Sequence, residues 1–287
     1  MTSPAGRERS SPGVAPRSPR PRPSVMSAYG ALLAAQLRTS VTTAAAYRLQ
    51  FILDGVLAVL WIGTGVVPLY VAFHGRPAVA GWTFDQSLVV LGIFTILKAI
   101  LDGAVNPSLV AIVDQIRTGT LDFVLMKPKD AQFLVCTSKF ELWRGIDLLA
   151  GVAILVVALA RLDRTPGPAE IALAIGLLFS GIVLLYSVWL LVVTSAFWVV
   201  RLDNLAFMFN ALFDFARWPR AVMGRVLAVV FTLILPLAVM TSFPAQALFG
   251  TLTLADAALA VGLAVVFGVG SRLAFRKALA QYTSASS

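Results

Sequence analysis

The chain has 287 residues, of which 59% are hydrophobic and only 13% are charged, with a mean hydropathy of +0.86. Soluble domains carry about 25% charged residues, so this composition excludes an ordinary water-soluble domain and indicates a membrane protein. The net charge of +9 comes from basic residues between the apolar runs and near the amino terminus, so we expect membrane lipids and no nucleic acid as partners.

A basic tail opens the chain. Residues 1–26 hold six prolines and five arginines among serines and glycines. Such a segment buries too little apolar surface to fold, so we expect it to be disordered. Its arginine and serine content is typical of a transit peptide, but its prolines would break the amphipathic helix of such a peptide. A start of translation at Met26 is a further alternative.

The next segment, residues 27–48, is too polar to span a membrane. Leu33 and Leu37 belong to an apolar stripe at helical spacing. We expect an amphipathic helix on the membrane surface, although an ordinary helical lead-in to the first span is the alternative. A similar interfacial helix is expected at residues 202–215, where Phe213 is one of the apolar residues that share a side.

Six stretches are apolar enough to cross a bilayer, which takes about 20 residues for about 30 Å of hydrocarbon. They are residues 49–73, 86–106, 142–160, 169–200, 220–241 and 254–275. Pro236 interrupts the fifth, and the fourth is long enough to tilt or to project beyond the bilayer. The sequence therefore predicts an all-α membrane protein with six spans in one domain, residues 49–281, before a polar tail at 282–287.

Positively charged loops orient the spans, because Lys and Arg stay on the cytoplasmic side during insertion. With the amino terminus inside, the cytoplasmic segments hold nineteen of these residues. The external loops hold three, Arg76, Arg161 and Arg164. We therefore expect both termini in the cytosol.

Three ionisable side chains inside the predicted spans are the first candidates for a functional cluster: Asp54, Lys98 and Asp102. A charge in hydrocarbon is costly unless it is paired or hydrated. Lys98 and Asp102 are four residues apart on one helix face and can form an ion pair. All three lie toward the predicted cytoplasmic side, so the cluster either fixes the packing of the first two spans or takes part in gating or substrate entry. Proton-coupled carriers usually keep their relay nearer the midplane.

The link between the second and third spans contains a predicted amphipathic helix. Pro107 is suited to open this helix, Ile112 and Ile116 lie on its apolar side, and Gly119 ends it. A mixed segment follows and stops at Pro128. Composition alone favours the alternative, a loop that simply lies on the bilayer.

Two short blocks of sequence carry a family resemblance. The stretch IRTGTLDFVLMKPKDAQF has an Arg, a Gly two residues later, then Leu-Asp and a Pro, which here are Arg117, Gly119, Leu121, Asp122 and Pro128. This pattern resembles the signature of type 2 ABC exporter permeases. The later FDFARWP, with Ala216, Arg217, Trp218 and Pro219, is similar to a second block in the bacterial branch that includes viologen and drug exporters. The resemblance covers the chain from about Tyr29 to Gln281, and the order and spacing of the blocks are more specific than either alone.

The resemblance implies the permease subunit of an exporter that moves a hydrophobic, amphiphilic or cationic compound across the bacterial cytoplasmic membrane. It implies that a cytoplasmic ATPase, a separate chain that binds ATP and Mg²⁺, presses on a coupling helix at residues 107–119 and on the signature residues after it. It also implies a second permease subunit, identical or different. A broken hairpin at the outer surface between the fifth and sixth spans is a further implication, which Pro236, Pro244 and Gly250 suit.

The chain itself is not expected to be an enzyme. It has no GxxxxGK[ST] phosphate loop, and its longest extramembrane stretch, 48 residues, is much shorter than a domain of about 100 residues. An ion-coupled secondary transporter, a non-transporting membrane scaffold and an intramembrane enzyme are the alternatives. The single cysteine, Cys136, and the single histidine, His74, predict neither a disulfide nor a metal site, and we expect no cofactor on this chain.

Overall fold

The computed structural model describes residues 30, 34–36, 38–39, 41–42, 48–126, 130–162, 164–197, 207 and 210–282. Within these ranges, the side chains of residues 48–52, 54–55, 58–59, 61–62, 117 and 196 are not described. The predicted basic tail, most of the first predicted interfacial helix, Pro128 and residues 283–287 therefore lie outside the description.

The described residues form helices and loops with no strand, and an isolated bridge pairs Val79 with Trp82. The long helices are α2 (Arg48–Phe73), α3 (Phe84–Ile100), α7 (Gly145–Ala160), α8 (Pro168–Thr194) and α12 (Leu254–Gln281). The other α-helices are α4 (Asn106–Thr118), α5 (Asp122–Leu125), α6 (Ala131–Cys136), α10 (Arg225–Val229) and α11 (Leu237–Leu248). Short π-helical or 3₁₀ turns are η1 (Leu101–Val105), η2 (Leu142–Arg144), η3 (Ser195–Phe197), η4 (Asp214–Arg217), η5 (Arg220–Val222) and η6 (Val230–Ile234).

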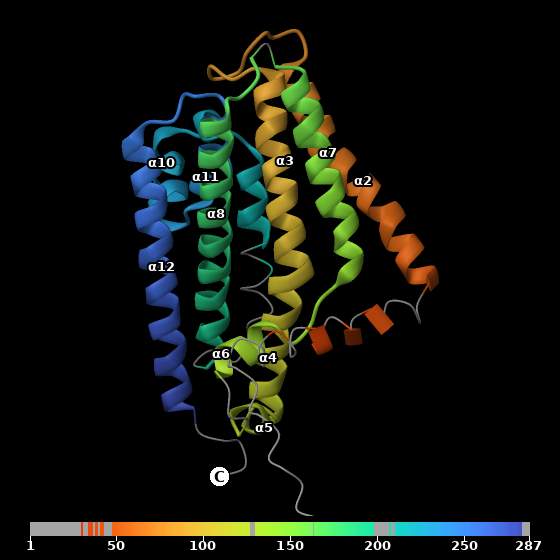
Figure 1. The fold of residues 1–287 in the computed structure, drawn as a ribbon, viewed down its shortest axis with the longest axis vertical. Coiled ribbons are helices and arrows are strands. Elements are labelled where there is room, and N and C mark those ends of the chain that lie inside the picture. Colours follow the sequence, from red (N-terminus) through yellow and green to blue (C-terminus); the bar gives the residue numbers. More distant parts are fainter. Residues whose placement is uncertain are drawn as a thin grey trace, which may run out of the picture.

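The long helices stand side by side in one bundle (Figure 1). α3 packs against both α7 and α8, and α12 packs against α8. α2 approaches α7 near the top of Figure 1 and diverges from it toward the bottom. We call the end with the α2–α3 and α7–α8 loops the upper end, and the end with α4, α5 and α6 the lower end.

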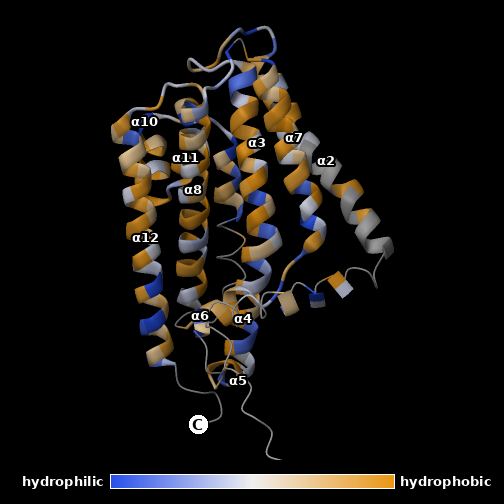
Figure 2. Ribbon diagram, in the orientation of Figure 1, coloured by the Kyte–Doolittle hydropathy of each residue, from blue (hydrophilic) through white to orange (hydrophobic). Residues whose placement is uncertain are grey.

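Apolar residues cover most of the length of the long helices, and hydrophilic residues gather in the loops and toward the lower end (Figure 2). Four described helices are long and apolar enough to cross a membrane: Phe84–Ile116, Leu142–Ala160, Pro168–Thr194 and Leu254–Gln281. A bent pair, Arg225–Ile234 with Leu237–Leu248, makes a fifth if it counts as one span. The first predicted span corresponds to α2, whose described apolar part is Gly63–Phe73. The number of six spans therefore stays a prediction.

Polar caps fix where two of these helices begin at the upper end. The Thr83 hydroxyl accepts a hydrogen bond from the Gln86 N–H (3.2 Å), and the Gln86 side chain accepts one from the Thr83 N–H (3.1 Å). Thr253 caps α12 in the same way through the Asp256 N–H (3.1 Å). These bonds satisfy N–H groups that have no partner inside the helix.

The predicted fifth span, residues 220–241, is not one continuous helix. The helix that starts at Arg225 ends in η6, and α11 follows after a bend of 96°. Pro236 lies at the bend. It breaks the helix there because its ring fixes φ and it has no N–H to continue the helix. The sequence located the interruption, and the family resemblance implied a broken hairpin in this region. The structure adds that the two halves point in different directions.

The bent pair enters the bundle from the upper end. Met240 of α11 lies against Gly181, which is about 20 Å along α8 from its upper end. At the other end of the hairpin, the carbonyl of Phe249 accepts a hydrogen bond from Arg164 in the α7–α8 loop (2.8 Å). α11 therefore runs from the middle of the bundle back to the upper end, as in a re-entrant hairpin.

The chain before this hairpin lies inside the bundle. Phe213 is fully buried, and its ring centroid is 5.4 Å from that of Phe94 on α3. Ala216 is also buried, and its carbonyl accepts a hydrogen bond from the Thr241 hydroxyl (2.9 Å). The described part of the segment predicted as an interfacial helix, residues 202–215, thus packs on α3 through Phe213 but leaves Phe207 and Phe215 exposed, and its position at the membrane surface stays a prediction. An apolar stripe buries equally well against lipid or against another helix, and here α3 is the partner.

The second span and the helix predicted to begin at Pro107 form one continuous helix through the π-helical turn η1. Within a helix the proline ring would clash with the carbonyl four residues earlier, that of Gly103. The wider turn accommodates the ring, and the Gly103 carbonyl accepts a hydrogen bond from the Glu141 N–H instead (2.8 Å). Pro107 lies in the first turn of α4, as predicted, but α4 continues the second span instead of forming a separate helix. α4 ends, as predicted, at Gly119, whose φ of +70° favours glycine.

Glycine allows α3 and α7 to cross with their backbones in contact. A Cβ added at Gly92 would lie 2.9 Å from the Leu155 nitrogen, and one at Gly151 would lie 2.8 Å from the Ile96 nitrogen. Small residues permit this approach in a membrane, where packing rather than water drives helix association. The crossing fixes the relative position of the two helices above the charged residues described next.

Candidate functional site

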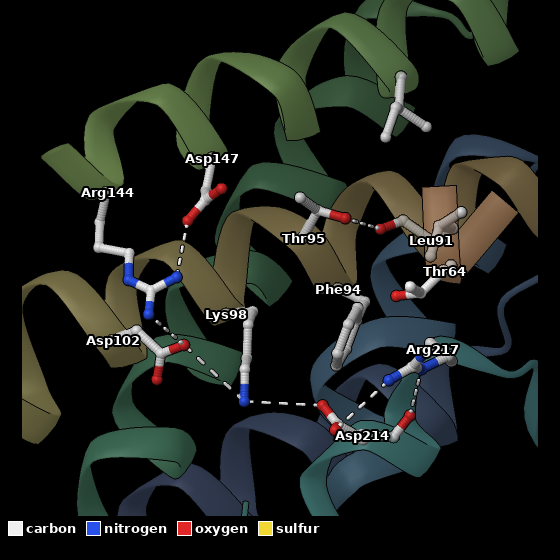
Figure 3. Close-up of a pocket in the computed structure, with 12 residues that line it drawn as sticks. Thr64, Leu91, Phe94, Thr95, Lys98, Asp102, Arg144, Asp147, Asp214 and Arg217 are labelled. Carbon is white, nitrogen blue, oxygen red and sulfur yellow. Dashed lines mark hydrogen bonds and ion pairs between the residues drawn. The ribbon is translucent and has the colours of Figure 1, made fainter. Parts of the chain in front are cut away.

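A cavity of about 340 Å³ opens between α2, α3, α7 and the 210–217 segment (Figure 3). Six charged side chains line it: Lys98, Asp102, Arg144, Asp147, Asp214 and Arg217. We call it the charged cavity. Its uncharged wall includes Gly65 of α2, Leu91 and Phe94 of α3, and Ile154 of α7.

α3 supplies the longest wall of the charged cavity. Leu91, Thr95, Lys98 and Asp102 follow one another at intervals of three or four residues, which places them on one helix face. Thr95 donates its hydroxyl to the Leu91 carbonyl (2.8 Å), so this polar group is satisfied within the helix. The wall is therefore apolar toward the upper end and charged toward the lower end.

Arg144 links α7 to α3 across the cavity. It precedes the first turn of α7, and its Nη1 donates to Asp147 Oδ2 at 3.0 Å. Its Nη2 lies 3.7 Å from Asp102 Oδ2 on η1. One guanidinium thus contacts two carboxylates from different helices. Its planar group with five N–H donors permits this arrangement.

Lys98 links α3 to the 210–217 segment. Its Nζ donates to Asn210 Oδ1 (3.2 Å) and lies 3.6 Å from Asp214 Oδ1 and 3.8 Å from Asp102 Oδ2. The predicted pair of Lys98 and Asp102 therefore forms, but as part of a larger network. The Lys98 ammonium thus joins α3 to the 210–217 segment, although the two lie more than 100 residues apart in sequence.

Arg217 completes the network from the other side. Its Nε donates to the Asp214 carbonyl (2.9 Å), and its Nη2 lies 3.4 Å from Asp214 Oδ2. The guanidinium lies 5.5 Å from the centroid of the Phe94 ring, a favourable cation–π geometry. The aromatic wall and the charged groups of the cavity are thus in direct contact.

The six charged residues balance as three cations and three carboxylates. The side chains of Asp102 and Asp147 are only 12% and 14% exposed, so each depends on its cationic neighbours. An incoming charged group must therefore exchange partners with these residues rather than neutralise a free charge. Among the described residues, no group of three or more His, Cys, Asp or Glu side chains is placed to hold a metal ion.

Comparison with known proteins assigns the chain to a family. A family model described as "ABC-2 family transporter protein" matches residues 59–286. The chain belongs to the ABC-2 transporter family. No curated protein and no solved structure gave a significant match. Members of this family are membrane permeases that work with an ABC ATPase subunit and are generally not themselves catalytic.

The charged cavity contains more charged residues than the three that the sequence analysis singled out inside the predicted spans. Arg144 and Asp147 lie within the predicted third span, so the reasoning that selected Lys98 would also have found them. Asp214 was missed because its segment was placed at the membrane surface. Asp54 lies in α2, but its side chain is outside the description.

The second family block, Ala216 to Pro219, leads from the charged cavity into the re-entrant hairpin. Ala216 is buried against α11, and Arg217 lines the cavity. Trp218 packs against the hydrophobic core, and the Pro219 carbonyl accepts the Val222 N–H (3.0 Å). The block thus positions one cavity residue and directs the chain away from α3.

The predicted coupling residues lie at the lower end, and most of their apolar side chains face the protein. Ile112 and Leu121 are buried, and Ile116 packs partly against the core. Asp122 lies in the first turn of α5. Arg117 lies in α4, but its side chain is not described. At the tip formed by α5, Phe123 and Met126 are exposed apolar side chains, which the sequence reasoning did not single out.

Proposed function

We propose that this ABC-2 permease exports a hydrophobic or amphiphilic compound, including cationic ones, from the cytoplasm. The charged cavity is the observation that supports this substrate class. Leu91 and Phe94 offer an apolar wall, and Lys98 and Asp214 lie beside it. Ligand sites commonly combine a mostly apolar lining with a few placed polar groups, which suits a compound that has an apolar body and a charged end.

We place the lower end in the cytosol of a bacterial cell, with the cytoplasmic membrane around the bundle. Arg272, Arg276 and Lys277 lie on the lower part of α12, which supports this orientation. Two of the basic residues that the sequence count placed in the cytosol lie elsewhere. Arg217 lies inside the bundle, and Arg225 belongs to α10, which lies toward the upper end. Basic residues at the lower end nevertheless still outnumber those at the upper end.

We place the ATPase contact at the tip formed by α5, with ATP and Mg²⁺ bound in the ATPase. Phe123 is 66% exposed and Met126 is 72% exposed, and both follow the family signature. Exposed apolar side chains at the end of a projection are typical of a protein contact. α5 lies between α4 and α6 in the chain, and α4 continues α3. A partner bound to α5 is therefore next to two helices that connect this tip to the bundle.

A second permease subunit, identical or different, is the remaining part of the proposal. α2 carries exposed apolar residues, among them Leu53, Leu60, Val67 and Val71. These suit either lipid or a second permease. We infer that the second subunit lies against α2, because this helix carries those exposed apolar residues and, among its described residues, also lines the charged cavity through Thr64 and Gly65.

The test starts from the tagged permease purified from its native membranes in mild detergent. We expect an ABC ATPase to co-elute and to hydrolyse ATP, and the complex in proteoliposomes to move a lipophilic cation in an ATP-dependent manner. The double substitution F123D/M126D is expected to remove the ATPase from the complex. Ala78→Asp, in the exposed α2–α3 loop, is the control and should leave it bound.

Two outcomes would contradict the proposal. Transport by the ATPase-free permease on a proton gradient would indicate a secondary carrier. An ATPase that stays bound to the F123D/M126D variant would remove α5 as the contact.

A further inference from the structure

α6 is fastened to the bundle by one residue that also starts the helix. Asp130 Oδ1 accepts the Phe133 N–H (3.1 Å), which caps the first turn of α6. Its other carboxylate oxygen, Oδ2, accepts Nη2 of Arg272 on α12 (2.8 Å). A single carboxylate therefore sets both the start of α6 and its position against α12.

Further hydrogen bonds extend this attachment to α8. Arg272 Nη1 donates to Gln132 Oε1 (3.0 Å), and Gln132 Nε2 donates to the Tyr186 hydroxyl (2.7 Å). The Tyr186 hydroxyl in turn donates to Cys136 Sγ (3.0 Å). We call these five residues, Asp130, Gln132, Cys136, Tyr186 and Arg272, the α6 clamp. It joins both ends of α6 to two long helices.

A line of contacts leads from the α6 clamp to the charged cavity. Tyr186 lies on α8 five residues after Gly181, which is packed against Met240 of α11. The next residue of α11, Thr241, holds the carbonyl of Ala216. Arg217 follows directly and lines the cavity. A displacement of α6 relative to the bundle therefore acts on helices that position one wall of the cavity.

The chain offers a second and separate route from the same tip. α4 continues α3 through η1, and Lys98 on α3 and Asp102 on η1 lie on the opposite wall of the cavity. A partner that moves α5 thus acts on α3 through α4. The same partner acts on α8 and α12 through the side-chain hydrogen bonds of the α6 clamp, which lengthen or break when α6 is displaced.

We propose that the α6 clamp transmits movements of the ATPase to α8 and α12, so that the two walls of the charged cavity are driven by different helices, α4 and α6. This inference rests on the proposed coupling to an ATPase. Asp130, Gln132, Tyr186 and Arg272 are positioning residues in this scheme. If the clamp serves only to hold the loop in place, its geometry should be the same in every nucleotide state.

Cys136 is a built-in reporter of the clamp. It is the only cysteine of the chain, and it lies at the end of α6 under the Tyr186 hydroxyl. Burial raises the pKa of its thiol to about 11. Because the thiolate is the reactive form, maleimides should modify Cys136 slowly while the clamp is closed and faster when α6 separates from α8.

The experiment measures the rate of N-ethylmaleimide labelling of Cys136 in the permease–ATPase complex in membrane vesicles. The rate is compared without nucleotide, with ATP and Mg²⁺, and with ATP, Mg²⁺ and vanadate. We expect the nucleotide states to differ by about threefold or more. We expect Arg272→Asp to raise the resting rate about tenfold and to abolish the nucleotide response, because two hydrogen bonds to α6 are lost and a carboxylate faces Asp130.

The matched variants separate the clamp from general disturbance. Lys277→Asp, at an exposed position of α12 outside the pocket that Asp130, Gln132 and Arg272 line, makes the same change of charge and should behave as the wild type. The double variant D130R/R272D restores the ion pair with reversed charges but not the cap of α6 or the bond to Gln132, and we expect it to recover part of the slow resting rate and of the nucleotide response. This recovery would also show that the single variant had not simply failed to fold.

Two results would overturn the inference. One is a wild-type labelling rate that is the same in all nucleotide states while the complex hydrolyses ATP. The other is a normal nucleotide response in Arg272→Asp. Failure of the proposed function itself is recognised differently, because then no ATPase co-purifies and no ATP is hydrolysed.

Discussion

The upper and lower parts of the bundle are held together by different forces. In the upper part, α3 and α7 meet at Gly92 and Gly151 with their backbones in contact. In the lower part, the same two helices are joined by Arg144, which reaches Asp102 and Asp147 around a cavity. Close backbone packing has one good geometry, whereas ion pairs can exchange partners. We therefore expect the upper part to stay fixed and the lower part to rearrange during transport.

The largest expected effect is at the glycine crossing. Gly151→Leu places a side chain where a Cβ already lies 2.8 Å from the Ile96 nitrogen, so α3 and α7 must separate. We expect a loss of about 3 kcal/mol of stability, measured by thermal unfolding in detergent. Gly176→Leu on α8 is the control, because nothing lies within 4 Å of a Cβ there. Equal stability of the two variants would show that the upper crossing is not tightly packed.

The next effect concerns the ion pairs of the lower part. Arg144→Met removes the cation that two poorly exposed carboxylates, Asp102 and Asp147, share. We expect a loss of about 2 kcal/mol, partly recovered when Asp147→Asn is added. Arg161→Met is the control, since Arg161 is 59% exposed and its pair with Asp85 should contribute less than about 1 kcal/mol. A similar loss in both variants would contradict a special role for the lower charges.

A smaller effect tests whether the lower part can exchange partners. Lys98 lies 3.6 Å from Asp214 and is shared with Asp102. A double-mutant cycle of Lys98→Met and Asp214→Asn should give a coupling free energy of about 1 kcal/mol, because both side chains are partly exposed. The measurement is thermal unfolding of the four proteins. Strict additivity would mean that this pair does not hold the 210–217 segment to α3.

The smallest effect is a pH dependence at the lower end. Burial alone would raise the pKa of Asp130, but hydrogen bonds from Arg272 and the Phe133 N–H outweigh it and hold this pKa below the ordinary value of 3.8. The folded protein therefore binds this proton less readily than the unfolded chain. The stabilisation is fully present above about pH 4 and is lost as the pH falls through the lowered pKa.

Thermal unfolding between pH 6 and pH 3 measures this contribution. We expect the wild type to lose more stability than Arg272→Met over this interval, by less than about 1 kcal/mol because both partners are partly exposed. Parallel pH curves for the two proteins would show that the ion pair adds nothing in solution.

Local sequence rules predicted the helices well where a helix is decided by its own residues. The third predicted span and the described helix Leu142–Ala160 coincide, because both rest on an unbroken apolar run. Gly119 and Pro236 were recognised as breaks for stereochemical reasons that need no neighbour. The family blocks at Arg117 and Ala216 also depend on sequence alone. The family match confirms the permease family that they suggested, and the viologen and drug exporter branch stays a prediction.

The candidate site was predicted only in part. Lys98 and Asp102 are neighbours on one helix turn, so their pairing followed from spacing. Asp214 and Arg217 reach the same cavity because the 210–217 segment packs on α3, and its apolar stripe would have suited a membrane surface equally well. The contact between Asp130 and Arg272 joins residues 142 positions apart, which no local pattern indicates.

The sequence by itself determined that the chain is a helical membrane protein of a permease family, because hydropathy, helix breakers and short signatures are properties of consecutive residues. Tertiary structure alone decided that α4 continues α3, how far the two halves of the interrupted fifth span diverge, and that six charges surround one cavity. Those features depend on which apolar helix faces pack against each other. The sequence of an apolar face does not indicate whether that face contacts lipid or protein.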